Sequence, residues 1–299
     1  MEVWEEILEL KKKRNAVILA HNYTLPEVQD VADMVGDSLG LSIKAAKTDA
    51  DVIVFCGVTF MGETAKILSP GKTVLMPCPD AICDMAETCP PEELMKAKEQ
   101  NPDRLVIGYV NTTGPAKCHM DICCTSGNAL KVIGSVSDRK ILFVPDKNLG
   151  RFVSERYPDT DIKLWHGCCP IHDELTFDDL AQLKSKYPDA YVMSHPECSE
   201  SVLAESDFIG STEAMINAVK DTDRKDIIVM TEVGMLHRLE SAYPDRRFIF
   251  PEKAVCKAMK KTTLESIRDC LRDMTGAVEL DDDVIRDAYA PVKRMTEIL

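Results

Sequence analysis

Three cysteines recur at nearly equal intervals along this chain of 299 residues. Cys83, Cys169 and Cys256 are separated by 86 and 87 residues. Three thiolates cannot close a four-coordinate structural zinc site, and the sequence contains no CxxC pair. Three thiolates around a cubane iron–sulfur cluster would instead leave one iron without a protein ligand, free to act as a Lewis acid. The spacing therefore predicts dehydration or condensation, whereas an electron carrier usually presents four cysteines.

Cys169 is preferred over its neighbour Cys168 because only Cys169 keeps the two intervals nearly equal. In a cytosolic chain of this size, cysteines are more typical of metal or catalytic sites than of disulfides. The other cysteines lack counterparts in all three repeats, so we expect them to be core or surface residues. They are Cys56, Cys78, Cys89, Cys118, Cys123, Cys124, Cys198 and Cys270.

Other polar residues recur with the same period. Three strand-like runs end in residues that lie 88 and 86 positions apart, namely His21, Tyr109 and His195. The same intervals separate three hydroxyl residues, each five positions after an aspartate: Ser38, Ser126 and Thr212. Each hydroxyl residue precedes a helix-like segment and is expected to be its N-cap. Three sets of features thus share one period, which predicts a threefold internal repeat.

Further apolar runs complete each repeat. They cover residues 51–57, 140–146 and 226–232, and then residues 73–77, 162–167 and 247–251. Strands that alternate with helices predict an α/β fold, with parallel sheets covered on both faces. Ligands bind beyond the carboxyl ends of such strands, so the recurring residues would converge if three units pack around a pseudo-threefold axis. The alternative is an unrelated string of βα units whose spacings agree by chance.

His195 and Glu197 lie two positions apart at a strand end. In an extended backbone both side chains face one side, as a pair of proton-transfer groups requires, whereas a surface turn is the alternative. Two more pairs have the same spacing and are expected to line a cavity: His21 with Tyr23, and Tyr109 with Asn111. The tyrosines could hold or protonate an oxygen of an intermediate, or be core residues.

The three hydroxyl residues could bind substrate carboxylates or phosphate, and their alternative role is helix capping alone. His172 follows Cys169 by three positions. It could hydrogen-bond a substrate or a cluster sulfur, or support the site structurally.

The formal net charge of −14 argues against nucleic-acid or anionic-membrane partners. No run approaches the roughly 18 apolar residues of a membrane span, and residues 1–15 resemble an amphipathic helix more than a signal peptide. We therefore expect a cytoplasmic protein. If its substrates are anions, we expect the site to be locally positive.

Motifs spread over nearly the whole chain include AHNYTLPEVQDVAD, GVTFMGETAKIL, FVPDKNLG, GCCPIH, SHPEC and PEKAVCKAMKKTTLE. Together they closely resemble those of quinolinate synthase, an iron–sulfur enzyme family of NAD biosynthesis. The resemblance implies three αβα domains around a pseudo-threefold axis, with a [4Fe-4S] cluster in the central cavity. It also implies condensation of iminoaspartate with dihydroxyacetone phosphate to quinolinate, releasing phosphate and two waters. An enzyme that produces iminoaspartate would be a possible partner.

The resemblance also assigns individual residues. It implies cluster ligands at Cys83, Cys169 and Cys256 and an acid–base glutamate at Glu197. Active-site histidines and tyrosines fall on His21, Tyr23, Tyr109, His172 and His195. An amide falls on Asn111, and anion-binding hydroxyls fall on Ser38, Ser126 and Thr212. Among these we assign catalysis to Glu197, His195, Tyr23 and Tyr109. Some relatives carry a CxxCxxC run at the last ligand, where this chain has Met259 and Thr262, so no regulatory disulfide is expected there.

The repeat predicts three domains. They cover residues 1–103 with an N-terminal helix, 104–188, and 189–299 with a C-terminal helix.

Two other functions remain open at this point. One is a different iron–sulfur hydro-lyase acting on a hydroxy acid, and the other is a metal or cluster carrier without catalysis, which would need exposed ligands.

Overall fold

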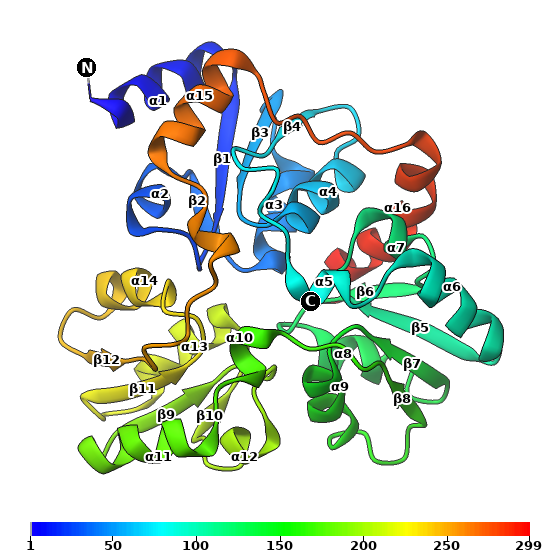
Figure 1. The fold of residues 1–299 in the computed structure, drawn as a ribbon, viewed down its shortest axis with the longest axis vertical. Helices are drawn as coiled ribbons and strands as arrows, with labels where there is room; N and C mark the ends of the chain where they lie inside the picture. Colours follow the sequence, from blue (N-terminus) through cyan, green and yellow to red (C-terminus); the bar gives the residue numbers. More distant parts are fainter. Residues whose placement is uncertain (1) are drawn as a thin grey trace.

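The computed structural model describes residues 2–299 and contains three four-stranded parallel sheets. Their strand orders are equivalent: β2-β1-β3-β4, β6-β5-β7-β8 and β10-β9-β11-β12. Figure 1 shows the three sheets, flanked by helices, as sectors around the middle of the molecule. The predicted α/β architecture of three similar αβα units around a pseudo-threefold axis is confirmed.

The first unit follows helix α1 (Val3–Lys13). Its strands are β1 (Ala16–His21), β2 (Met34–Gly36), β3 (Val52–Cys56) and β4 (Thr73–Leu75). Its helices are α2 (Pro26–Val31), α3 (Ser38–Lys47), α4 (Thr59–Leu68), α5 (Asp84–Glu87) and α6 (Pro91–Gln100). The central strand β1 is almost wholly apolar and buried, as expected of a parallel strand with both faces covered.

The second unit repeats this plan. Its strands are β5 (Arg104–Tyr109), β6 (Ile122–Cys124), β7 (Lys140–Val144) and β8 (Ile162–Leu164). Its helices are α7 (Gly114–Lys117), α8 (Ala129–Gly134), α9 (Lys147–Ser154), α10 (Pro170–Asp173) and α11 (Phe177–Lys186).

The third unit repeats it again and is followed by the C-terminal helices. Its strands are β9 (Tyr191–Ser194), β10 (Phe208–Ile209), β11 (Asp226–Met230) and β12 (Arg247–Ile249). Its helices are α12 (Glu200–Leu203), α13 (Thr212–Ala218), η1 (Val219–Asp221) and α14 (Met235–Ala242). The remaining helices are η2 (Ala258–Lys260), α15 (Leu264–Asp273) and α16 (Asp282–Glu297).

The aspartate that recurs in each repeat joins the first two strands of its unit. Asp33 accepts a hydrogen bond from the backbone N–H of Ile18 at 2.8 Å. Asp121 and Asp207 bind the corresponding N–H groups of their own units at 2.7 and 2.8 Å. Part of the repeated sequence pattern is therefore structural, because this bond pins each short edge strand to its neighbour.

The prediction that Ser38, Ser126 and Thr212 are N-caps is wrong. Asp37 caps α3 by accepting from the N–H of Gly40, and Ser211 caps α13 by accepting from that of Ala214. In the second unit α8 begins only after Asn128, beyond Ser126. The N-cap is the last residue with extended backbone before the helix, and in α3 and α13 that residue lies one position earlier than predicted. The predicted hydroxyls are thereby left free of capping bonds.

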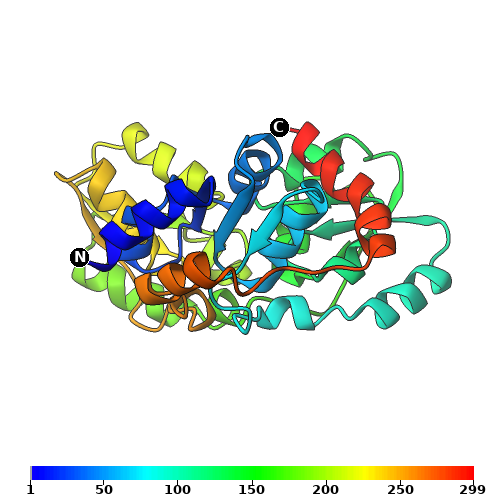
Figure 2. The same cartoon turned by 90° about the horizontal axis from the view of Figure 1, so that it is seen from above.

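The C-terminal segment ties the units together. Helix α15 packs against α1, and α16 packs against α4, α7 and β6. Figure 1 and Figure 2 show α15 beside α1 and the connecting segment running across to α16 on the second unit. A continuous set of buried apolar residues also runs through all three units. The three sheets are therefore held against one another by the core and by these helices.

The predicted domain boundaries fall in short connections, between α6 and β5 and between α11 and β9. The division into domains stays a prediction. Among residues 2–299, no helix has the length and apolar character needed to cross a membrane.

Gly276 holds the connecting segment against the first sheet, and its replacement tests that anchor. Its φ is +75°, and its carbonyl accepts from the backbone N–H of Met76 at 2.8 Å. A Cβ at this position would lie 2.1 Å from the carbonyl oxygen of Met76. We expect Gly276→Ala to lower the free energy of unfolding by about 2 kcal/mol or more, measured by urea denaturation. Gly71→Ala is the matched control, because no atom lies within 4 Å of a Cβ there. Equal stability of the two variants would contradict the anchoring role.

Candidate functional site

One cavity is lined by residues that follow strands of all three sheets. These sheets surround the middle of the view in Figure 1. All thirteen residues assigned to the site from the sequence line this cavity. They are His21, Tyr23, Ser38, Cys83, Tyr109, Asn111, Ser126, Cys169, His172, His195, Glu197, Thr212 and Cys256. Each unit contributes a cysteine, a hydroxyl residue and a strand-end aromatic or histidine.

Two histidines at strand ends are held in the same way. The backbone N–H of Tyr23 donates to Nδ1 of His21 at 3.2 Å, and that of Glu197 donates to Nδ1 of His195 at 3.4 Å. The chain turns immediately after each histidine, since Thr24 and Cys198 bond back to the histidine carbonyls. The prediction of an extended backbone here is therefore wrong, and a tight turn brings each pair of side chains to the cavity.

These contacts fix which ring nitrogen carries the proton. Burial lowers the pKa of both His21 and His195 to about 3, so each ring is neutral at neutral pH. Because Nδ1 accepts a hydrogen bond, the single proton of each ring must be on Nε2. Nε2 of His195 lies 3.1 Å from the hydroxyl of Ser126 and can donate to it.

Glu197 is the centre of a buried hydrogen-bond network. Its Oε1 accepts from the hydroxyl of Tyr109 at 2.5 Å, and its Oε2 lies 2.7 Å from Nδ1 of His172. Burial alone would raise the pKa of Glu197, but nearby His195 and His172 and these two hydrogen bonds keep it below its usual range. Glu197 is therefore ionised at neutral pH.

The network continues beyond His172. Its Nε2 lies 2.8 Å from the hydroxyl of Thr231, which in turn lies 2.7 Å from the hydroxyl of Tyr23. Burial, followed by the charge of Glu197, raises the pKa of Tyr23 and of Tyr109 well above the ordinary value. Both phenols therefore remain protonated and able to donate. Sequence reasoning missed Thr231, and no motif or spacing pointed to it.

The three cysteines occupy equivalent local positions. Cys83 and Cys169 are the N-caps of α5 and α10, and Cys256 lies just before η2. Backbone N–H groups at the start of each short helix oppose the rise in the pKa of the thiol, as those of Ala86 and Met85 do for Cys83. Burial raises the pKa of all three thiols, and that of Cys83 reaches about 12. Without a nearby cation these thiols stay protonated, whereas a bound metal would favour the thiolates.

Two acidic residues hold the backbone of two of these cysteines. Asp146 accepts from the N–H of Cys169 at 3.0 Å, and Glu232 accepts from that of Cys256 at 3.0 Å. Asp146 and Glu232 lie two positions after the ends of the equivalent strands β7 and β11, whereas Val58 lies two positions after the end of β3. Sequence reasoning missed both acids, although the matching runs KILFVPD and DIIVMTE end in an acidic residue at the same repeat position.

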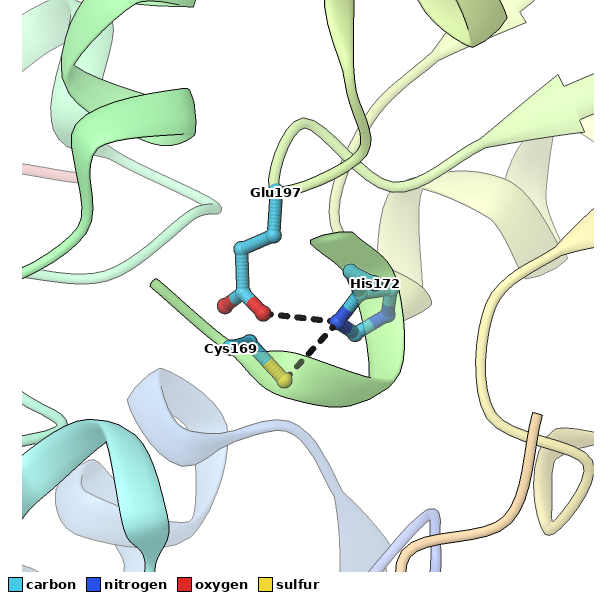
Figure 3. A group of neighbouring side chains, drawn as sticks. All are labelled: Cys169, His172 and Glu197. Carbon is cyan, nitrogen blue, oxygen red and sulfur yellow. Dashed lines mark hydrogen bonds and ion pairs between the residues drawn. The ribbon is translucent and has the colours of Figure 1, made fainter. Parts of the chain in front are cut away.

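A second set of donor atoms could hold a single metal ion. The donor atoms of Cys169, His172 and Glu197 all lie within 4.8 Å of one another, and Figure 3 shows them facing a common point. Nδ1 of His172 lies 3.3 Å from the sulfur of Cys169 as well as 2.7 Å from Glu197. Cys169 thus belongs both to this trio and to the set of three repeated cysteines.

The residues that precede the three predicted anion-binding hydroxyls meet near Gly127. A Cβ on Gly127 would lie 3.5 Å from side-chain oxygens of all three neighbouring residues, Asp37, Thr125 and Ser211. The residues that follow them are the predicted anion binders Ser38, Ser126 and Thr212, which line the cavity. On another part of the wall, the buried Oδ1 of Asn111 has no hydrogen-bond partner among the described residues. It is available to a ligand.

Three α/β units thus surround one cavity into which titratable and hydroxyl side chains converge among apolar ones, an arrangement typical of an enzyme. Residues 5–297 match the model of the family described as quinolinate synthetase A protein. Similar proteins called quinolinate synthase occur in Geobacter metallireducens (48% identical, covering 98% of this chain and 97% of that protein) and in Methanoregula boonei (47%, covering 97% and 96%). Another occurs in Aquifex aeolicus (44%, covering 99% and 94%). The chain belongs to the quinolinate synthase family.

The neutral, buried His21 predicts a specific pH dependence of stability. Its pKa is about 3 in the folded protein, lowered first by burial and then by His195 and Lys260. The unfolded chain therefore binds more protons between about pH 3 and pH 6.5, and stability must fall as the pH falls through this range. At pH 5 the loss from this one group is about 2 kcal/mol.

We expect His21→Asn to reduce the loss of stability between pH 7 and pH 5 by that amount, measured by urea denaturation of the metal-free protein. If wild type and variant lose equal stability over this range, His21 is not buried in its neutral form.

Proposed function

We propose that this chain is a quinolinate synthase that condenses iminoaspartate with dihydroxyacetone phosphate, releasing phosphate and two waters. One observation supports this most directly. The thirteen residues predicted to form the site line a single cavity, in a chain that is 44–48% identical to proteins of that name over nearly its whole length.

We further propose that Cys83, Cys169 and Cys256 hold a [4Fe-4S] cluster. The donor set fits such a group, because the three sulfurs line one cavity and each unit supplies only one of them. Their thiols also influence one another, because Cys256 raises the pKa of Cys83 and Cys83 raises that of Cys169. When bound, such a cluster would supply a Lewis-acidic iron that has no protein ligand.

Glu197 is the proposed proton acceptor. It is ionised and buried, and Tyr109 and His172 orient both of its oxygens. Tyr109 is the proposed donor that returns a proton to an oxygen of the substrate, because its raised pKa keeps it protonated. Tyr23 has the same property at the far end of the network, where Thr231 connects it to His172.

The remaining lining residues are proposed to bind and orient the substrates. The Nε2–H group of His21 and the hydroxyls of Ser38, Ser126 and Thr212 are neutral donors suited to carboxylate or phosphate oxygens, and the Nε2–H of His195 orients the Ser126 hydroxyl. The unpartnered Oδ1 of Asn111 would accept from an N–H or O–H group of a substrate. Burial of these groups excludes water, which would protect an imine from hydrolysis.

An enzyme that forms iminoaspartate must supply this labile substrate, and we propose the cytoplasm as the compartment. All twelve cysteines are free, which fits a reducing environment.

Neither alternative function receives comparable support. A carrier would need exposed ligands, but these cysteines are partly buried in the wall of a cavity, and the relatives named above are not called hydro-lyases.

Product analysis tests the reaction. The anaerobically reconstituted protein should form quinolinate and one equivalent of phosphate from iminoaspartate and dihydroxyacetone phosphate, measured by chromatography. Glu197→Gln should lower the rate by about 100-fold or more, because removing a positioned acid–base group typically costs this much. Absence of quinolinate from a preparation with full iron and sulfide content would remove the proposal.

Iron and sulfide content tests the ligand assignment. We expect Cys83→Ala, Cys169→Ala and Cys256→Ala each to lose most of both when prepared without oxygen, because two thiolates hold such a cluster poorly. Cys168→Ala is the matched control and should retain both. If Cys168→Ala loses iron and sulfide while Cys169→Ala retains both, Cys168 would be the ligand instead of Cys169.

A further inference from the structure

Asn22 is a fully buried residue that the proposed chemistry does not use. It follows His21 at the end of β1 and lies against the third unit. Its side-chain Nδ2 donates to the hydroxyl oxygen of Thr212 at 2.7 Å, and its Oδ1 accepts from Arg238 at 2.8 Å. A contact between two units therefore ends on one of the proposed anion-binding hydroxyls.

The orientation of the Asn22 amide follows from its partners. A guanidinium group can only donate, so the atom that faces Arg238 must be the amide oxygen. The amino group must then face Thr212. The backbone of Asn22 is fixed as well, because its N–H donates to the carbonyl of Gly36 and its carbonyl accepts from Gln29.

This orientation determines what Thr212 can do. Its oxygen accepts from Asn22, so its own proton must point to a different acceptor. Among residues 2–299, the structure gives the Thr212 hydroxyl no acceptor, and the residue lines the cavity. The hydroxyl is therefore a donor directed at whatever occupies the cavity.

A second hydroxyl is oriented by the same principle. The Nε2–H of neutral His195 donates to Ser126, which leaves the Ser126 proton free for the cavity. No net positive charge is available near Thr212 to attract an anion directly. Arg238 also contacts the carboxylate of Glu213, which offsets its charge, and the partly buried Asp37 lines the same cavity. Neutral donors aimed at the ligand are what remains to bind an anion in this acidic protein.

We propose that Asn22 is a positioning residue that turns the Thr212 hydroxyl into a hydrogen-bond donor for an anionic substrate group, and that Arg238 sets the direction of Asn22. The inference rests on the proposed function for the identity of that group. It is a phosphate or a carboxylate oxygen, which offer the same acceptor chemistry.

Asn22→Asp tests this with almost no change of shape. A carboxylate has no proton to donate, so Thr212 would donate to Asp and turn away from the cavity, while the bond from Arg238 is kept. On the cluster-loaded protein, we expect the Kd for inorganic phosphate, for quinolinate, or for both to rise about tenfold, measured by calorimetry. If only the Kd for phosphate rises, Thr212 belongs to the phosphate subsite. If only the Kd for quinolinate rises, it belongs to the carboxylate subsite. Iron content and melting temperature should stay at wild-type values.

The new charge could also repel an anion directly, and a double-mutant cycle separates this effect. Thr212→Ala alone should weaken binding about tenfold, Thr212→Ser should bind like wild type, and adding Asn22→Asp to Thr212→Ala should cause no further loss. An unchanged Kd in Asn22→Asp, or a loss that persists in the Thr212→Ala background, would overturn the inference. Wild type that binds these anions but forms no quinolinate would instead overturn the proposed function.

Discussion

Three parallel sheets that point their carboxyl ends at one axis impose the main constraint on this molecule. Polar groups that follow the strands are buried there, and a buried polar group without a partner is costly. The protein meets this requirement by pairing them across units. Tyr109 of the second unit bonds Glu197 of the third, and Asn22 of the first bonds Thr212 of the third. The site is thus also part of what joins the units.

The same constraint explains how a chain with a net charge of −14 could bind anionic substrates. Lysine or arginine side chains do not line the cavity within the described residues. Neutral donors oriented by second partners take their place, as His195 does for Ser126. In a buried site such fixed donors act strongly because little water competes with them.

The repeat allowed much of this to be predicted from the sequence. Equal spacing of Cys83, Cys169 and Cys256 was enough to place them on equivalent loops, because equivalent positions in a repeat occupy equivalent sites around the axis. The spacing did not predict the local backbone geometry. The caps of α3 and α13 lie one residue before Ser38 and Thr212, and His195 is followed by a turn where an extended backbone was predicted.

Contacts between units were harder to predict. The packing of α15 on α1 and of α16 on the second unit is not encoded in the helices' own periodicity, which predicts an apolar face but not its partner. Asp146 and Glu232 could have been found, since both end equivalent strand runs. Thr231 could not, because its importance arises only from the residues that it meets in the folded chain.

X-ray diffraction at the iron absorption edge, on crystals of the anaerobically prepared protein, tests the central claim most directly. The account predicts one compact group of anomalous scatterers within bonding distance of the sulfur atoms of Cys83, Cys169 and Cys256 together. A single scatterer held between Cys169, His172 and Glu197, with Cys83 and Cys256 unbound, would contradict it.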